Sequence, residues 1–196
     1  MRSFAARIAV VTGGGSGMGR ELVRQLVAEG CHVATCDVSA ATIVETRALC
    51  DADRSPQGTR ITAHVADVSD AAQVARFRGE VAAQHDTDVI HLLFNNAGIS
   101  GGGSFIADAP EQWEKTFNVC WGGVYHCTRA FMPMLRQADA AHIINTSSVN
   151  GWRRRSDRAA VPLAGSASAR PARLQSSKRA RIVATITSIV NGERWY

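Results

Sequence analysis

The sequence predicts an α/β fold with a doubly wound parallel sheet over about its first 150 residues. Five short runs rich in Val, Ile and Thr are almost continuously apolar, as expected of strands buried on both faces. Amphipathic stretches separate them, as in crossover connections between parallel strands. Because such crossovers are right-handed, they place helices on both faces of the sheet.

Each of the first four apolar runs precedes a candidate helix, and the fifth run follows the last helix. The five runs cover residues 7–12, 31–36, 60–66, 88–95 and 141–147. In the first helical stretch, 19–30, four apolar residues recur at helical spacing, and Gly30 stands where a helix commonly ends. These four residues are Leu22, Val23, Leu26 and Val27. The spacing predicts a helix directly after the first strand.

Three further helices are expected, over residues 40–50, 70–84 and 111–137. Asp70 is a favoured residue type at a helix N-terminus, and Pro110 suits a first helical turn. Pro133 has no backbone N–H, so it predicts a kink or an early end in the last helix.

The chain changes composition at residue 152. Of the 30 residues in 152–181, 23 are Arg, Ala, Ser, Pro or Gly, which favours an unpacked segment. The β-branched run 181–190 is the exception and could pair as a strand. We therefore expect one domain over 1–151, a basic irregular tail over 152–196, and a sheet that is truncated or aberrant after the fifth strand.

The excess positive charge lies in the same tail. The formal net charge is +5, but residues 152–196 carry ten Lys and Arg against two Asp and Glu. Such a tail could contact nucleic acid or an acidic surface. Its aromatic residues are too few for a base-stacking platform, so nucleic acid is the least favoured partner. They are Trp152, Trp195 and Tyr196.

Cysteine usage and hydropathy indicate a cytoplasmic protein. The five cysteines are odd in number and form no CxxC pair, which favours buried, reduced thiols over a disulfide framework or a zinc site. No apolar run approaches the roughly 20 residues that span a bilayer. The N-terminal run passes into glycines rather than into a secretory leader. We expect neither a metal nor a membrane partner.

The glycine-rich stretch TGGGSGMGR, residues 12–20, lies between the first strand and the first helix. Glycines there allow a tight turn and a close approach of the backbone to a pyrophosphate, whose charge the N–H groups of the helix N-terminus can meet. The alternative is a plain flexible turn. No GK[ST] sequence follows, so a nucleoside-triphosphatase loop is disfavoured.

Asp37 ends the second predicted strand. A carboxylate at this place can accept hydrogen bonds from both ribose hydroxyls of an adenosine and would repel a 2′-phosphate. Neither 13–19 nor 36–40 contains a Lys or Arg to neutralise that phosphate. The residues favour NAD over NADP, and the alternative role for Asp37 is to cap the helix near Ala40.

Four motifs in this order resemble the short-chain dehydrogenase/reductase family. They are TGGGSGMG at 12–19, AHVADVSD at 63–70, FNNAG at 94–98 and INTSSVNG at 144–151. The resemblance covers residues 5–151 and implies a Rossmann-type sheet. It also implies an NAD(P)-dependent oxidoreductase that acts on a small-molecule secondary alcohol or ketone, and a homo-oligomer formed through helix 111–137.

The resemblance assigns roles by position. Asn118 matches an Asn that holds a water in a proton relay, and Ser148 matches the serine that hydrogen-bonds the substrate. The cofactor-binding residues that the loop, Asp37 and the resemblance indicate are Gly13, Ser16, Gly17, Met18, Gly19, Asp37, Val38, Asp67, Val68, Asn96, Ala97 and Gly98.

Some of these residues have structural alternatives. Asn96 could serve only the fold, and Asp67 could cap a strand end. Asn118 could be an ordinary buried amide. Ser147 rather than Ser148 could face the site, because neighbours on a strand point to opposite faces.

The family's YxxxK pair, which exchanges the substrate proton, is missing. The chain has two tyrosines, Tyr125 before the serine motif and Tyr196 at its last position. LQSSKRA, 174–180, resembles the motif but has Leu174 in place of the tyrosine, so Lys178 is a weak catalytic candidate. Tyr125 is expected to be a packing residue.

We therefore expect impaired turnover, and the alternative is a dinucleotide-binding protein without turnover. The tail is interpreted as a shifted reading frame or an alternative end. The coding DNA after the codon for Gly151 tests this interpretation. If neither of the two alternative reading frames encodes a YxxxK, the interpretation is wrong.

Overall fold

The computed structural model describes residues 3–53, 56, 58–101, 106–148 and 183–189, and nothing below refers to the structure of the rest. Lys178 lies outside the described residues. The elements are β1 (Ile8–Thr12), α1 (Gly17–Ala28), β2 (His32–Asp37), α2 (Ala40–Ala52), β3 (Ile61–Val65), α3 (Ala71–His85), β4 (Leu92–Asn95), α4 (Pro110–Phe117), the π-helical turn η1 (Asn118–Gly122), α5 (Gly123–Gln137), β5 (His142–Ser148) and β6 (Val183–Ile189).

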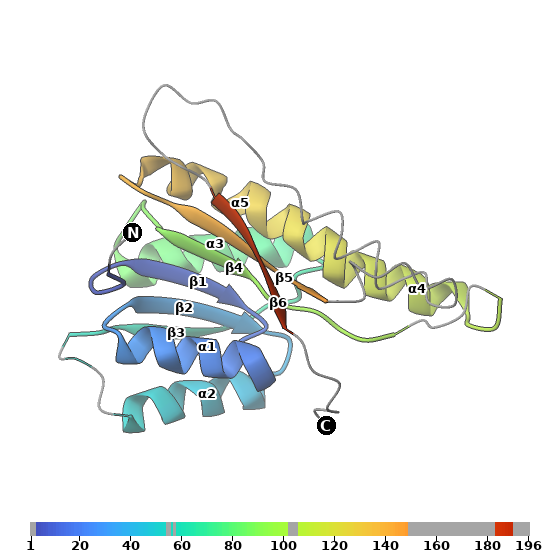
Figure 1. Cartoon of the computed structure of the whole chain (residues 1–196), viewed down its shortest axis with the longest axis horizontal. Coiled ribbons are helices and arrows are strands. Elements are labelled where there is room, and N and C mark those ends of the chain that lie inside the picture. Colours follow the sequence, from blue (N-terminus) through green and yellow to red (C-terminus); the bar gives the residue numbers. More distant parts are fainter. Residues whose placement is uncertain (1–2, 54–55, 57, 102–105, 149–182, 190–196) are drawn as a thin grey trace.

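The strands form a single parallel sheet in the order β3-β2-β1-β4-β5-β6 (Figure 1). The predicted α/β fold with a doubly wound parallel sheet is confirmed, with its first five strands in the order 3-2-1-4-5. The sheet does not end at the fifth strand, because β6 pairs with β5 from His142↔Val183 to Ser148↔Ile189. The β-branched run near the C-terminus thus pairs as a strand, as its composition allowed.

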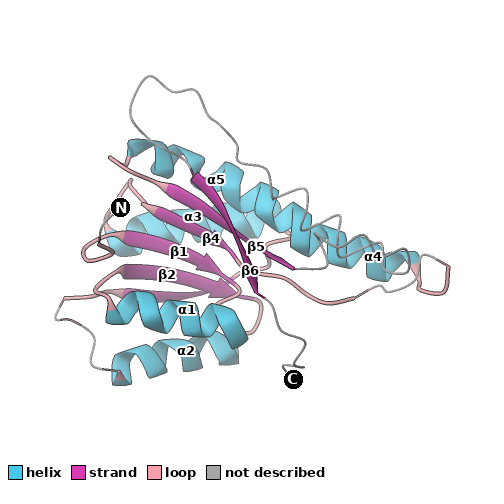
Figure 2. Ribbon diagram, in the orientation of Figure 1, coloured by secondary structure: helices cyan, strands magenta, loops and turns pink. Residues whose placement is uncertain are grey.

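Helices cover both faces of the sheet (Figure 2). On one face, α1 and α2 pack over a core that includes Val11, Val23 and Val33. On the other, α3 and α5 enclose a larger core around Phe77 and Phe131, whose ring centroids lie 5.5 Å apart in edge-to-face geometry. The strands β1, β2 and β4 bury side chains on both faces, which explains their continuous apolar sequences.

The helix boundaries follow local capping chemistry. The Ser39 side chain accepts a hydrogen bond from the Thr42 N–H at the start of α2, and the Asp70 carboxylate accepts from two N–H groups at the start of α3. Pro110 is the first residue of α4, as predicted. Gly30 follows α1 with a φ of +78°, a conformation that glycine adopts without a Cβ penalty.

The long helix predicted over 111–137 is present but does not end early at Pro133. Helix α5 continues through Pro133 to Gln137, because the buried side chains of Phe131 and Met134 anchor the helix on both sides of the proline. Upstream, α4 and α5 are joined by the π-helical turn η1.

A chain of buried hydrogen bonds links β3 to α3. The Glu80 carboxylate can only accept, so His64 donates to it from Nδ1 at 2.7 Å. The Nε2 atom of His64 therefore accepts from the Thr62 hydroxyl at 2.9 Å. The Thr62 oxygen in turn accepts from Nε2 of His85, also at 2.9 Å. Every hydrogen in this chain has a defined direction when both histidines are neutral.

Candidate functional site

A cleft of about 590 Å³ opens at the carboxyl ends of the strands. Loops that follow parallel strands meet at this edge of the sheet, so residues far apart in sequence gather there. All twelve residues predicted to bind a cofactor line this cleft. Among the described residues, the lining is Gly13, Ser16, Gly17, Met18, Gly19, Asp37, Val38, Ala66, Asp67, Val68, Asn96, Ala97, Gly98, Ile99, Lys115 and Val119.

The glycine loop has no room for side chains at Gly13, Gly14, Gly15 and Gly19. A Cβ on Gly19 would lie 2.0 Å from the Gly13 carbonyl oxygen, and one on Gly13 would lie 2.7 Å from Cα of Ala97. Gly13 also has a φ of +69°, which favours glycine. The loop is therefore an ordered, closely packed turn rather than a flexible one.

The start of α1 is arranged to receive an anion. Its N-cap residue, Ser16, makes no side-chain hydrogen bond to the helix, whereas the N-termini of α2 and α3 are both capped by a side chain. Free N–H groups and the positive end of the helix dipole favour a negatively charged ligand. A cleft that ends at an uncapped helix fits the pyrophosphate of a dinucleotide.

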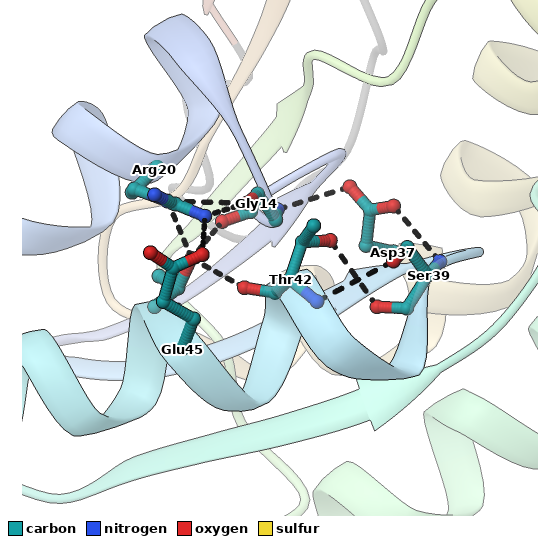
Figure 3. Close-up of polar contacts among 8 residues, drawn as sticks. Gly14, Arg20, Asp37, Ser39, Thr42 and Glu45 are labelled. Carbon is teal, nitrogen blue, oxygen red and sulfur yellow. Dashed lines mark hydrogen bonds and ion pairs between the residues drawn. The ribbon is translucent and has the colours of Figure 1, made fainter.

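Asp37 lies beside this loop, held by two backbone N–H groups (Figure 3). Its Oδ2 accepts from Gly15 at 3.0 Å, and its Oδ1 accepts from Ser39 at 3.1 Å. The side chain that caps α2 is Ser39, so the capping role considered for Asp37 belongs to its neighbour. A carboxylate has about four acceptor positions, so about two remain for ligand hydroxyls.

Asn96 connects three strands as well as lining the cleft. Its Nδ2 donates to the Thr12 carbonyl at 3.1 Å and to the Gly13 carbonyl at 3.3 Å. Its Oδ1 accepts from the Thr146 hydroxyl at 3.2 Å. The structural role considered for Asn96 is thus supported by contacts that tie the ends of β1 and β5 to the loop after β4.

The adjacent pair Asp67 and Val68 has a structural role too. The Asp67 carboxylate accepts from the backbone N–H and the hydroxyl of Ser69, at 2.8 and 2.7 Å, and so orders the turn before α3. Val68 is buried, and a Cβ on Gly123 would come within 2.6 Å of its side chain. Gly123 therefore allows the start of α5 to approach this wall of the cleft.

The residues expected at the catalytic end are less closely assembled. Asn118 is exposed and does not line the cleft, so it is not the ordinary buried amide considered for it. Ser148 is the last residue of β5. The Ser147 hydroxyl is buried and has no hydrogen-bond partner within the described part of the chain.

Cys120 is the η1 residue that faces the loop after β4. Its Sγ lies 3.5 Å from the Ile99 carbonyl oxygen and 3.7 Å from the Cβ position of Gly98. Sequence reasoning missed Cys120 and the lining residues Lys115, Val119, Ile99 and Ala66. Ala66 lies within the motif at 63–70 and Ile99 directly follows the motif at 94–98, which was the available signal, but no sequence pattern indicated a π-helical turn.

Tyr125 lies on the outside of the same helix. Phe117, Trp121 and Tyr125 stack in succession, with ring centroids 5.2 and 5.8 Å apart, and all three are exposed. The Tyr125 hydroxyl accepts from Arg129 at 2.8 Å. Because Tyr125 does not line the cleft, its phenol is not placed to exchange a proton there.

Four of the five cysteines are buried, as expected, and Cys120 is the partly exposed exception. Burial raises the pKa of the Cys31 and Cys127 thiols to about 12. In the described ranges, no three His, Cys, Asp or Glu side chains gather in a way that could hold a metal ion. Those ranges also contain no helix with the length and apolar character to cross a bilayer.

The family model for short chain dehydrogenases matches residues 7–161. The chain belongs to this family. A probable oxidoreductase of Mycobacterium tuberculosis, EphD, is 35% identical over 150 residues, which are 76% of this chain and 24% of that protein. The meso-2,3-butanediol dehydrogenase of Serratia marcescens is 32% identical over 148 residues, 76% of this chain and 55% of that protein. The chain thus spans about a quarter of the first relative and about half of the second.

Solved structures of short-chain dehydrogenases have the same fold. One from Burkholderia phymatum, in complex with NAD, is 32% identical with a TM-score of 0.77 and covers 85% of this chain and 58% of that one. One from Mycobacterium smegmatis is 25% identical with a TM-score of 0.79 and covers 96% of this chain and 79% of that one. The chain therefore has the Rossmann-type fold of the short-chain dehydrogenase family.

Proposed function

We propose that residues 1–151 form an NAD-binding domain and that the chain carries out hydride transfer between NAD and a secondary alcohol or ketone, at a low rate. The observation that carries the first part is the cleft itself. Twelve residues from four separate segments of the chain, 13–19, 37–38, 67–68 and 96–98, line one cavity next to the uncapped start of α1. Glycine positions that exclude a Cβ keep that cavity open to a ligand.

The preference for NAD over NADP rests on Asp37. Its fixed carboxylate offers acceptors to ribose hydroxyls and repels a 2′-phosphate. Lys115, on α4, is the one basic residue among the described residues that line the cleft. Lys115 belongs to α4, and the loop and strand segments 13–19 and 36–40 around Asp37 contain no Lys or Arg to neutralise the extra phosphate.

The remaining assignments are part of the same proposal. The first N–H groups of α1 bind the pyrophosphate, and Asn96, Ala97 and Gly98 hold the loop against the cofactor. Ser148, at the end of β5, hydrogen-bonds the alcohol or carbonyl oxygen of the substrate. When bound, the nicotinamide supplies or receives the hydride. The exposure of Asn118 gives its relay role no support, and Lys178 lies outside the described residues.

The low rate follows from the proton that must accompany the hydride. A tyrosine normally exchanges it in this family, and the two tyrosines of this chain are Tyr125, stacked outside the cleft, and Tyr196. Loss of a general acid or base typically lowers a rate by about a hundredfold to ten-thousandfold. The second candidate, a dinucleotide-binding protein without turnover, is favoured by the same observation.

Two measurements test this proposal. Fluorescence titration with NADH and NADPH should show binding of both, with NADH bound more tightly. Incubation with NAD and a panel of secondary alcohols should then give slow formation of NADH. Binding without any turnover would leave only the second candidate, and no binding of either cofactor would refute both.

We also propose a homo-oligomer formed through α4 and α5. The exposed stack of Phe117, Trp121 and Tyr125 gives this helix an apolar outer face, unusual for a surface in contact with water alone. Light scattering should give a mass above that of one chain, and Trp121→Glu should return it to the monomer. A wild-type monomer would refute this proposal.

A further inference from the structure

Arg20 lies beside the glycine loop (Figure 3) and is not among the residues that line the cleft. Its Nη2 and Nε both donate to the Gly15 carbonyl oxygen, at 2.6 and 3.1 Å. Nε also approaches the Thr46 hydroxyl at 3.1 Å, and Nη2 pairs with the Glu45 carboxylate at 2.6 Å. The guanidinium is thus fixed by three acceptors, and two of its hydrogen bonds end on one backbone carbonyl.

The peptide group between Gly14 and Gly15 is held as firmly as the Gly15 carbonyl. The Gly14 carbonyl accepts from the buried Thr46 hydroxyl at 2.9 Å, and the Gly15 N–H donates to Asp37 at 3.0 Å. A Cβ on Gly15 would lie 2.5 Å from the Thr42 hydroxyl, so this backbone lies directly against α2. The loop therefore has little freedom to turn about Gly14.

Arg20 acts on the next peptide, between Gly15 and Ser16. The C=O and N–H of a trans peptide point in opposite directions, and no cis peptide is present in the described residues. Holding the Gly15 carbonyl toward Arg20 therefore turns the Ser16 N–H away from Arg20. Ser16 lines the cleft, and its N–H has no partner among the described residues.

We propose that Arg20 is a positioning residue that aims the Ser16 N–H at the diphosphate of the dinucleotide. It touches neither the cofactor nor the substrate. Glycine imposes almost no rotational preference on its own backbone, so the peptide after Gly15 needs an external restraint, and the two hydrogen bonds from Arg20 supply it. This inference rests on the proposed nucleotide binding and adds to it a residue that recognises the diphosphate indirectly.

The test separates the diphosphate from the rest of the nucleotide. NADH binding is followed by fluorescence, and ADP and adenosine are used as competitors, since only ADP carries a diphosphate. In Arg20→Met, the Kd of NADH and of ADP should rise about tenfold or more, because one hydrogen bond to a charged group is lost, while that of adenosine changes less than twofold. Arg20→Lys, which keeps the charge but not the two-pronged contact, should lie between.

Arg24→Met is the matched control. Arg24 lies one turn further along α1 and pairs with Glu21 and Asp53 at the surface, so its removal takes the same charge from the same helix without touching the loop. Its nucleotide affinities should match those of the wild type. Equal losses for ADP and adenosine in Arg20→Met, or no loss for either, would overturn the inference. Wild-type protein that fails to bind NADH would instead refute the proposed function.

If Arg20→Met does not fold, as judged by circular dichroism, Arg20→Lys alone decides the question. A selective loss of ADP affinity in Arg20→Lys supports the inference, and wild-type affinity for ADP refutes it.

Discussion

The two ends of the cleft differ in how their polar groups are bonded. At the glycine loop, every backbone polar group of Gly14 and Gly15 has a partner, supplied by α1, α2 and β2. At the end of β5, the Ser147 hydroxyl is buried without a partner among the described residues. The nucleotide end is thus preorganised by contacts within about the first 50 residues, whereas the catalytic end depends on more than the described residues supply.

The largest expected effect is at the nucleotide end. Gly19→Ala should raise the Kd of NADH at least about a hundredfold, because its Cβ would overlap the Gly13 carbonyl oxygen at 2.0 Å. Fluorescence titration measures the change. Gly79→Ala is the control, since a Cβ at this α3 position meets nothing within 4 Å. Alanine there should raise the unfolding free energy by about 0.5–1 kcal/mol and leave affinity unchanged. Wild-type affinity in Gly19→Ala would mean that the loop is not rigid.

A pair of hydroxyl deletions tests the comparison directly. Thr46→Val should lower the free energy of unfolding by about 2 kcal/mol, because the Gly14 carbonyl loses its buried donor. Ser147→Ala removes a hydroxyl that has no described partner, so it should leave that free energy unchanged or raise it by up to about 1 kcal/mol. Urea unfolding measures both. If Ser147→Ala lowers the free energy of unfolding as much as Thr46→Val does, the polar groups at the catalytic end are hydrogen-bonded to the same extent as those at the nucleotide end.

Acid should weaken the packing of α3 against β3, away from the cleft. Burial, followed by the charges of Arg60, His32 and His64, lowers the pKa of His85 from 6.5 to about 4. Between these values the unfolded chain binds more protons than the folded one, so the unfolding free energy falls as the pH drops from 6.5 to 4. The titration of His85 is expected to lower the unfolding free energy by on the order of 2 kcal/mol over this pH range.

Urea unfolding across this pH range checks the prediction. His85→Gln can still donate to Thr62 but does not titrate, so its stability should depend less on pH. His126→Gln, on α5 and outside this hydrogen-bond chain, should keep the wild-type pH dependence. Identical pH profiles for His85→Gln and the wild type would show that another group carries the acid response.

The smallest effect concerns Cys120, at the junction of the two ends. It should be the one cysteine of five that a thiol reagent labels in the folded protein, because the other four are buried. Bound NAD should slow this labelling about tenfold, since Cys120 lies against Gly98 and Ile99 at the cleft wall. Mass spectrometry after timed labelling measures both rates. Unchanged labelling in saturating NAD would place the cofactor away from η1.

Local chemistry predicted most of the fold and of the nucleotide end. Buried strands have a continuous apolar signature, and the capping residue Asp70 and the first-turn residue Pro110 announce helix starts. The residues of the glycine loop, Asp37 and Asn96 meet at one cleft because their loops all follow parallel strands. Once the strand order is known, the position of these loops is determined.

The features that could not be predicted from the sequence depend on contacts between helices and strands. The restraint on Gly15 requires α1 and α2 to pack so that Arg20, Thr46 and Glu45 meet. The orientation of Asn118 and Cys120 depends on η1, because a π-helical turn shifts the phase of the residues in it away from the 3.6-residue period. Asn118, whose role was assigned by its sequence position alone, is therefore exposed, and the thiol of Cys120 lies at the wall of the cleft.

The strand order also has a consequence for how the chain is synthesised. The strand β1 lies inside the sheet and leaves the ribosome first, and β2 and β3 add to one side of it in the order in which they are translated. The nucleotide end can therefore assemble on the nascent chain with only local crossovers, before β4 returns to the free edge of β1. The strand β6 comes last and from furthest along the chain. Vectorial synthesis thus makes both partners of the Asp37 and Gly15 contact available well before the serine motif is translated.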